Sequence, residues 1–360
     1  MDKISLSLDD SSQLTQLNLT IKQNPDDLQA YYDRSELYYS QGNYDAGIKD
    51  LDAIVQLDNQ QTLAYMFRGY GYGKLNQNRQ AIADYTQAIA LCPNYAKAYF
   101  NRGTVYDRLE EYIKALLDYD NAIKYNPDNS EAYYNRGLVY NKLNRFTEAI
   151  ADYTQVIQLN PQDGEAYYNR ANIYNKTKQY DLALADYNQA ITLNPQDLEA
   201  YYNRANVYHK TKVFEKAIAD YSKIVECNSR HAPTYYNRAT TYLASQQYQQ
   251  AIADFSQAIE LNPNYAEAYY NRAIAHNKIQ EYSQAIASHQ AAISLKNDYA
   301  EAYGNLGLVY TTLGEDELAI DNLQKSATLF KKQNNRPLYQ YVSEKLRVLR
   351  SPASEDEKLK

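Results

Sequence analysis

The chain has 360 residues, a net charge of −7 at pH 7 and an isoelectric point of about 5.3. This acidity argues against a general binder of nucleic acids or of anionic membranes. Its two cysteines, Cys92 and Cys227, lie too far apart in the repeat pattern described below for a disulfide, and we expect Cys227 to be a small core residue. No secretory signal or transmembrane run is seen, so we expect a cytoplasmic protein.

The first 27 residues are predicted to form a polar tail and one capping helix. Leu14, Leu17 and Ile21 would form the apolar stripe of this helix, and its N-cap is expected among residues 10–12. Such a helix would cover one end of the repeats that follow.

From Leu28 onwards the sequence repeats every 34 residues, nine times, without an insertion. We number the positions of each copy from 1 to 34. The copies occupy residues 28–333 and begin at Leu28, Thr62, Ala96, Ser130, Gly164, Leu198, Ala232, Ala266 and Ala300. A 34-residue period is the length of a two-helix solenoid repeat, in which each copy packs only against its neighbours.

The positions within a copy favour two closely packed helices. Positions 8 and 20 carry small residues, which let facing helices approach each other. In the fourth copy Ile150, Tyr153 and Ile157 form one stripe of the second helix, and Pro161 follows its end.

Residues 334–350 are predicted to form a C-terminal capping helix, opened by Pro337. Its apolar stripe consists of Leu338, Val342, Leu346 and Leu349. Residues 351–360 form a charged tail that we expect to be disordered.

The spacing of these residues resembles the tetratricopeptide repeat, which has an aromatic residue near its start, a small residue at position 8 and alanine at position 20. In the fourth copy the matching residues are Tyr133, Gly137, Tyr140, Ala149, Tyr153 and Pro161. The resemblance implies an all-α, right-handed superhelical solenoid of antiparallel helix pairs, with a concave groove that binds extended peptides. The chain departs from the family in having no tryptophan and in carrying arginine instead of leucine at position 7.

Position 6 is asparagine in seven successive copies, although asparagine is not a favoured residue inside helices. These residues are Asn101, Asn135, Asn169, Asn203, Asn237, Asn271 and Asn305. An amide can both donate to and accept from a peptide unit, and the family resemblance implies that position 6 faces the groove. We therefore expect a row of amides that binds the main chain of a peptide. The alternative is that these side chains only cap or bridge neighbouring helices.

Position 5 carries a row of tyrosines next to the asparagines. The candidate groove residues in this row are Tyr134, Tyr168, Tyr202, Tyr236 and Tyr270. Tyrosine suits a binding surface because its ring is rigid and apolar and its tip is polar. A second core stripe is an equally good interpretation. Glutamates at position 2 and lysines at position 13 are expected to be solvated surface residues.

Arginine at position 7 needs a partner, because an unpaired buried charge is costly. A row of aspartates at position 23 can provide it. Copy eight has Arg272 but Ser288 at position 23, and copy nine has Leu306 and Asn322. The sequence leaves open whether each arginine pairs within its own copy or with the preceding one.

No motif of an enzyme, a cofactor site or a metal site is present, so we expect no catalytic activity, no cofactor and no metal. His276 and His289 replace two core tyrosines in copy eight, and we expect a buried, hydrogen-bonded pair rather than half of a metal site.

The sequence therefore predicts a monomeric adaptor or scaffold that binds an extended segment of another protein. A single-stranded RNA-binding repeat protein is the alternative, because tyrosines beside a basic row could stack bases and contact phosphates. The acidic charge and the strict 34-residue period argue against it. The sequence names neither the partner nor the pathway.

Overall fold

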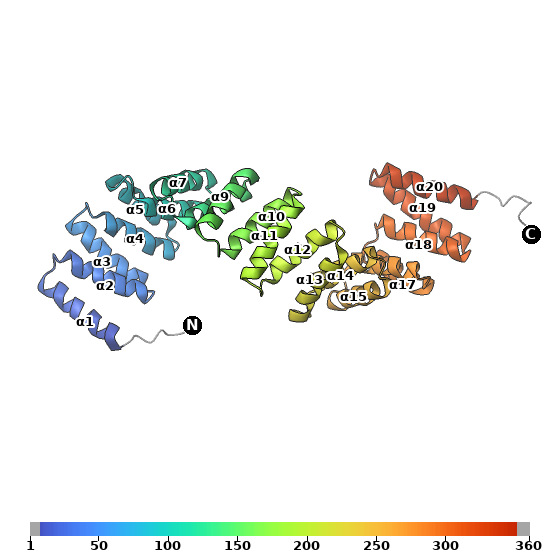
Figure 1. The fold of residues 1–360 in the computed structure, drawn as a ribbon, viewed down its shortest axis with the longest axis horizontal. Helices are drawn as coiled ribbons and strands as arrows, with labels where there is room; N and C mark the ends of the chain where they lie inside the picture. Colours follow the sequence, from blue (N-terminus) through green and yellow to red (C-terminus); the bar gives the residue numbers. More distant parts are fainter. Residues whose placement is uncertain (1–7, 351–360) are drawn as a thin grey trace, which may run out of the picture. The chain divides into compact units, whose positions relative to one another are not determined.

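The computed structural model describes residues 8–350, and this part of the chain is entirely helical, with 20 helices and no strand (Figure 1). The all-α prediction is confirmed. The predictions for residues 1–7 and for the tail 351–360 lie outside the described residues. The chain divides into two compact units, Met1–Ile173 and Tyr174–Lys360, which are described separately below.

The first unit contains one leading helix followed by helix pairs. Its helices are α1 (Leu8–Gln23), α2 (Leu28–Ser40), α3 (Tyr44–Leu57), α4 (Thr62–Lys74), α5 (Asn78–Leu91), α6 (Ala96–Arg108), α7 (Tyr112–Tyr125), α8 (Ser130–Lys142), α9 (Phe146–Leu159) and most of α10 (Gly164–Lys176). The helix α1 begins at least two residues earlier than predicted, so residues 10–12 lie inside it and do not cap it.

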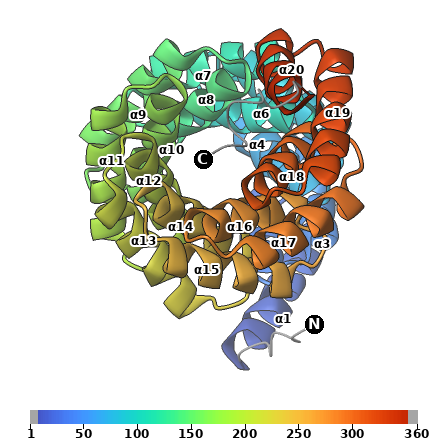
Figure 2. The same ribbon diagram turned by 90° about the vertical axis from the view of Figure 1, so that its right-hand side faces the viewer.

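The second unit continues the same alternation. Its helices are α11 (Tyr180–Leu193), α12 (Leu198–Lys210), α13 (Phe214–Cys227), α14 (Ala232–Ala244), α15 (Tyr248–Leu261), α16 (Ala266–Lys278), α17 (Tyr282–Leu295), α18 (Ala300–Leu313), α19 (Asp316–Lys332) and α20 (Arg336–Arg350). The helices α12 to α17 of this unit follow an arc. The first helices α12, α14 and α16 lie on the inner side of this arc, and the second helices α13, α15 and α17 lie on its outer side (Figure 2).

Each copy is a first helix and a second helix joined by the same tight turn. The residue at position 15 has a positive φ in every copy, for example 58° at Asn144. The amide of Arg145 donates to the carbonyl of Tyr140, which satisfies a carbonyl at the end of the first helix. The left-handed residue therefore reverses the chain, and this makes the two helices of a copy antiparallel.

The small residue at position 8 makes room for the aromatic ring at position 24 of the same copy. A Cβ atom added to Gly137 would lie only 3.1 Å from Cε1 of Tyr153, whose side chain is fully buried. The same ring position is fully buried at Tyr119 and Phe255. Close packing around these rings forms the interior of each repeat.

The arginine at position 7 pairs within its own copy. The Nε and Nη2 atoms of Arg136 donate to both carboxylate oxygens of Asp152, at 2.9 and 2.6 Å. Its Nη1 atom donates to Asp120 of the preceding copy at 2.6 Å, and its guanidinium lies 5.5 Å from the ring centroid of Tyr133. Each such arginine therefore joins two copies. The same two-sided arrangement is present at Arg34, Arg68, Arg102, Arg204 and Arg238.

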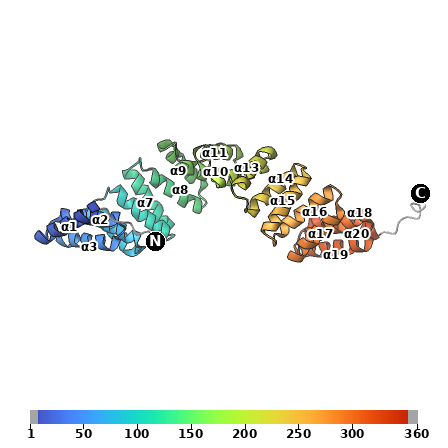
Figure 3. The same cartoon turned by 90° about the horizontal axis from the view of Figure 1, so that it is seen from below.

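The two terminal helices pack like members of further repeats. Asn18 of α1 accepts from Arg34 at 2.6 Å, as the second helix of a preceding copy would. Helix α20 packs on α19, with Val342 and Leu346 buried against it, and Figure 3 shows α18, α19 and α20 together.

Two expectations about single regions can now be compared with the structure. Cys227 is exposed at the end of α13, so the prediction of a core residue was wrong: its position at the last turn of the helix faces outwards. No helix in residues 8–350 is both long enough and apolar enough to span a membrane.

Candidate binding surface

In the second unit three asparagines at position 6 are hydrogen-bonded to the tyrosine at position 5 of the preceding copy. The Nδ2 atom of Asn271 donates to the hydroxyl of Tyr236 at 3.0 Å, and that of Asn305 donates to Tyr270 at 3.0 Å. We call each such asparagine–tyrosine pair a rung. Asn237 and Tyr202 form a third rung at 2.8 Å.

The first unit has one complete rung, in which Asn169 donates to the hydroxyl of Tyr134 at 2.9 Å. Asn101 instead lies 3.9 Å from the sulfur of Met66, which is a weak acceptor. Asn135 follows Phe100, which has no hydroxyl, and its amide makes no hydrogen bond within the described part of the chain. The remaining candidates, Asn203 on α12 and Tyr168 on α10, are partly buried.

The rungs orient the amides but leave acceptors unused. The Oδ1 atoms of the rung asparagines accept no hydrogen bond within residues 8–350. Each amide also has a second N–H. The alternative interpretation, that these side chains bridge neighbouring helices, therefore holds for one N–H of each rung. In the rung of Asn237 the same amide nitrogen also donates to Oδ1 of Asn206 at 3.2 Å.

The tyrosines at position 5 belong both to the core and to the surface row. Their rings pack against the buried aromatic ring at position 24, with centroids 5.8 Å apart for Tyr134 and Tyr153 and 5.8 Å for Tyr236 and Phe255. Burial raises the pKa of Tyr236, and the negative charge of Glu267 adds to this, so the hydroxyl stays protonated. The ring is fixed by packing, and it holds the hydroxyl in place for the asparagine.

The charged rows were expected to be only solvated, and the structure corrects this in part. Glu165 at position 2 accepts from the hydroxyl of Tyr134 at 2.9 Å, so it adjoins a rung. Lys142 at position 13 donates to Asp107 of the preceding copy at 2.8 Å. The sequence could have suggested both contacts, because each joins rows that are neighbours on the first helices.

Several hollows adjoin the first helices of the first unit. One of about 220 Å³ is lined by Tyr134, Asn135 and Glu165 among others. Another, of about 470 Å³, lies between α2 and α4 and includes Tyr32, Asp33 and Phe67. Asp33 and Phe67 are the two exceptions in the asparagine row, and this irregularity is the sequence signal that could have pointed to the second hollow.

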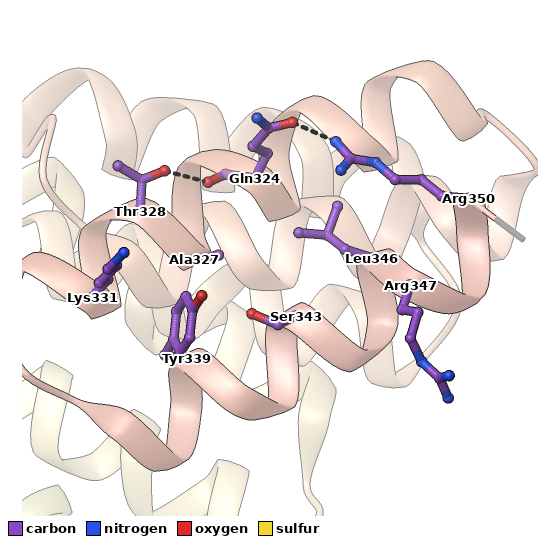
Figure 4. Close-up of a pocket in the computed structure, with 9 residues that line it drawn as sticks. All are labelled: Gln324, Ala327, Thr328, Lys331, Tyr339, Ser343, Leu346, Arg347 and Arg350. Atoms are coloured by element: carbon purple, nitrogen blue, oxygen red, sulfur yellow. Dashed lines mark hydrogen bonds between the residues drawn. The ribbon is translucent and has the colours of Figure 1, made fainter.

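A further hollow, of about 820 Å³, lies between α19 and α20 (Figure 4). Two of the three cationic side chains that line it are engaged or directed elsewhere, whereas the side chain of Lys331 makes no hydrogen bond or ion pair within residues 8–350. Arg350 donates to Gln324 at 2.6 Å, and Arg347, which points away from the hollow, pairs with Glu344 at 2.8 Å.

The two histidines of copy eight are both buried, as expected, but in the described part of the chain only His276 is hydrogen-bonded. His276 contacts Glu281 at 2.7 Å, whereas neither ring nitrogen of His289 has a partner among the described residues. Burial lowers the pKa of His289 to about 4, so it is neutral at pH 7. Within residues 8–350 no three His, Cys, Asp or Glu side chains are grouped as metal ligands.

Comparison with protein families agrees with the repeat pattern. Models described as tetratricopeptide repeat or TPR repeat match residues 15–62, 69–110, 96–129, 130–163, 164–197, 186–219, 232–265, 255–287, 275–314 and 300–333. The chain belongs to the tetratricopeptide repeat family. Proteins of this family mediate protein–protein interactions and are typically not catalytic. No curated protein sequence matches the chain.

Solved structures of other tetratricopeptide repeat proteins are similar in part. YrrB, described as having an unusual peptide-binding site, is 25% identical, with a TM-score of 0.48 over 51% of this chain and 95% of its own. A tetratricopeptide repeat protein from Parabacteroides merdae is 23% identical, with a TM-score of 0.48 over 69% of this chain and 99% of its own. A chain of the Cut9–Hcn1 hetero-tetramer is 13% identical, with a TM-score of 0.46 over 94% of this chain and 92% of its own.

Proposed function

We propose that this tetratricopeptide repeat protein is an adaptor that binds an extended segment of another protein through the rungs on its first helices. The observation that carries the proposal is the hydrogen bond from Asn237, Asn271 and Asn305 to the tyrosine at position 5 of the preceding copy, which recurs in three successive copies. This bond fixes the amide before a ligand arrives, so that little side-chain entropy is lost on binding.

The free groups of a rung fit a peptide main chain. Each rung presents an amide oxygen that can accept from a peptide N–H, and the rungs of Asn271 and Asn305 also present a second amide N–H that can donate to a peptide carbonyl. An extended chain has unpaired groups of both kinds, and leaving them buried without partners costs about 1–3 kcal/mol each. Recognition of this type would tolerate many side chains in the bound segment.

The location that we propose for this binding is the cytoplasm. The free cysteines Cys92 and Cys227 belong to different units, and a reducing compartment suits them.

The test is a variant in which Asn237, Asn271 and Asn305 are changed to alanine. Binding partners would be captured from a lysate, identified by mass spectrometry, and reduced to the shortest peptide that binds. We expect the variant to lose affinity for that peptide. We also expect N-methylation of the peptide backbone to weaken its binding to the unaltered protein, because a methyl group removes the donor that the amide oxygen accepts.

A matched control separates binding from folding. Changing Tyr236 and Tyr270 to phenylalanine removes the rung hydroxyls but keeps Asn271 and Asn305, so affinity should fall less than in the alanine variant. If the folded alanine variant binds the peptide as tightly as the unaltered protein, the rungs are structural and the proposed site is wrong.

A further inference from the structure

The first two copies lack asparagine at position 6. Copy one has Asp33 and copy two has Phe67 at this position. The rung that would join these copies is therefore missing, and the buried hydroxyl of Tyr32 has no hydrogen-bond partner among the described residues. An unpaired buried hydroxyl costs stability. Such departures from a regular pattern are typical of functional sites.

The missing rung leaves a cavity with an apolar wall. The cavity of about 470 Å³ is lined by Leu63 and Phe67 of α4 and by Tyr32 and Tyr39 of α2. Leu63 is 49% exposed and Phe67 38% exposed, although both are large apolar side chains. The Tyr39 hydroxyl donates to the carbonyl of Phe67 at 3.0 Å, which fixes this wall relative to α2. A concave, partly apolar and fixed surface suits a large apolar side chain.

The polar side of the same cavity is negatively charged. Asp33 and Glu36 line it, and no lysine or arginine does. Asp33 accepts one hydrogen bond, from Gln29 at 2.6 Å, and Glu36 has no hydrogen bond or ion pair within residues 8–350. Two carboxylates without a cationic partner, next to an apolar wall, are complementary to a positively charged group on an apolar neighbour.

We propose that this cavity binds a protein segment in which a large apolar residue is next to lysine or arginine. The apolar side chain packs against Leu63 and Phe67, and the cation lies between the carboxylates of Asp33 and Glu36. The site does not rest on the asparagine–tyrosine rungs, because neither copy that forms it contains one.

The experiment uses fluorescence anisotropy with the full chain and labelled synthetic peptides. The first peptide is Gly-Leu-Lys-Leu-Lys-Gly, and two matched peptides carry Glu instead of Lys or Ser instead of Leu. We expect the Leu-Lys peptide to bind most tightly and to weaken as salt is added. Changing Asp33 to Asn and Glu36 to Gln should weaken it roughly 5–10-fold and abolish most of the salt dependence.

The apolar wall is tested separately with Phe67→Asn, which places an amide next to the Tyr32 hydroxyl. This variant should be more stable to heat than the unaltered protein and should bind the Leu-Lys peptide more weakly. A purely structural role for Phe67 would not give these opposite effects. A charge-matched control, Asp45→Asn with Glu110→Gln, alters exposed residues that do not line the cavity and should leave the affinity unchanged.

The asparagine-to-alanine variant of the second unit serves as a further control, because it should bind the Leu-Lys peptide normally. Failure of the rung proposal would therefore not affect this result. The inference is overturned if the unaltered protein binds none of the peptides. It is overturned equally if the Lys and Glu peptides bind alike, or if the Asp33 and Glu36 variant keeps full affinity.

Discussion

Changing Ser288 to aspartate should stabilise copy eight. Arg272 is the one arginine at position 7 for which the structure offers no carboxylate within the described residues. It is hydrogen-bonded only to the hydroxyls of Ser288 and Ser256, both at 3.2 Å. Burial lowers the pKa of Arg272, whereas the hydrogen bond to Asp254 raises that of Arg238 in copy seven.

The size of the effect follows from the paired copies. In copy seven Arg238 donates to both oxygens of Asp254, at 2.6 and 2.8 Å, and the carboxylate is only 10% exposed. Charge-assisted hydrogen bonds contribute about 1.5–3 kcal/mol, and the desolvation of the new carboxylate offsets part of this. The guanidinium of Arg272 is already partly buried in the unaltered protein, so its own desolvation adds little further cost. We therefore expect Ser288→Asp to raise the free energy of unfolding by about 2 kcal/mol.

The assay is urea unfolding at pH 7.5 and low salt, combined with hydrogen exchange of the α16 and α17 amides. Hydrogen exchange is needed because the stability of a repeat protein is local to each repeat and its neighbours. The matched reverse change is Asp254→Ser, which should weaken copy seven by a similar amount. If Ser288→Asp lowers stability while Asp254→Ser has no effect, the arginine row does not stabilise the repeats.

Three further changes have defined outcomes. The pKa of His289 in the folded chain is about 4, so below about pH 6.5 the unfolded chain binds a proton that the folded chain does not. The free energy of unfolding should therefore fall by about 3 kcal/mol between pH 7 and pH 4. Urea unfolding of the His289→Phe variant should lack this loss. Glu110 has a φ of 59°, a left-handed conformation that strains a residue with a side chain but not glycine. Glu110→Gly should therefore raise the free energy of unfolding, measured in urea, by about 1 kcal/mol. An unchanged free energy of unfolding would show that Glu110 is not strained. Ending the chain at Asn335 should expose Leu323 and Phe330 of α19 and cause association, which a monodisperse monomer in light scattering would contradict.

The fold was predictable because the same local pattern recurs in each copy. The first helix of copy four was expected from its period and is observed at Ser130–Lys142. The division into end helices, nine repeats and a tail remains a proposal, although α1 and α20 lie where end helices were expected. The start of α1 was placed too late, because serine and aspartate near a helix start can lie within its first turn as well as cap it.

Contacts between rows were harder to predict than the rows themselves. The sequence places Arg136, Asp152 and Asp120 on defined faces, but it does not say which copy lies within reach of the guanidinium. The structure shows that Arg136 reaches both aspartates, one in its own copy and one in the preceding copy. The lack of partners for His289 was equally invisible, because a single sequence does not reveal which polar atoms are close enough to bond.

The exceptions in each row provide controls within the protein itself. The hydroxyl at position 5 and the amide at position 6 of the next copy form a bond only when both are present. Phe67 leaves the Tyr32 hydroxyl unpaired, and Phe100 leaves the amide of Asn135 unpaired, within the described part of the chain.

The two exceptions have different consequences for binding. An unpaired amide keeps all its donors and acceptors for a ligand but is not oriented in advance, whereas a rung amide is oriented and offers fewer groups. Asn135 also borders a hollow that contains Glu131 and Glu165. A ligand group bound there would meet an amide that is not oriented in advance, whereas the rung amides of the second unit would offer fixed contacts. If the asparagines bind a ligand as proposed, the residue at position 5 of the preceding copy determines whether each amide is oriented before the ligand binds.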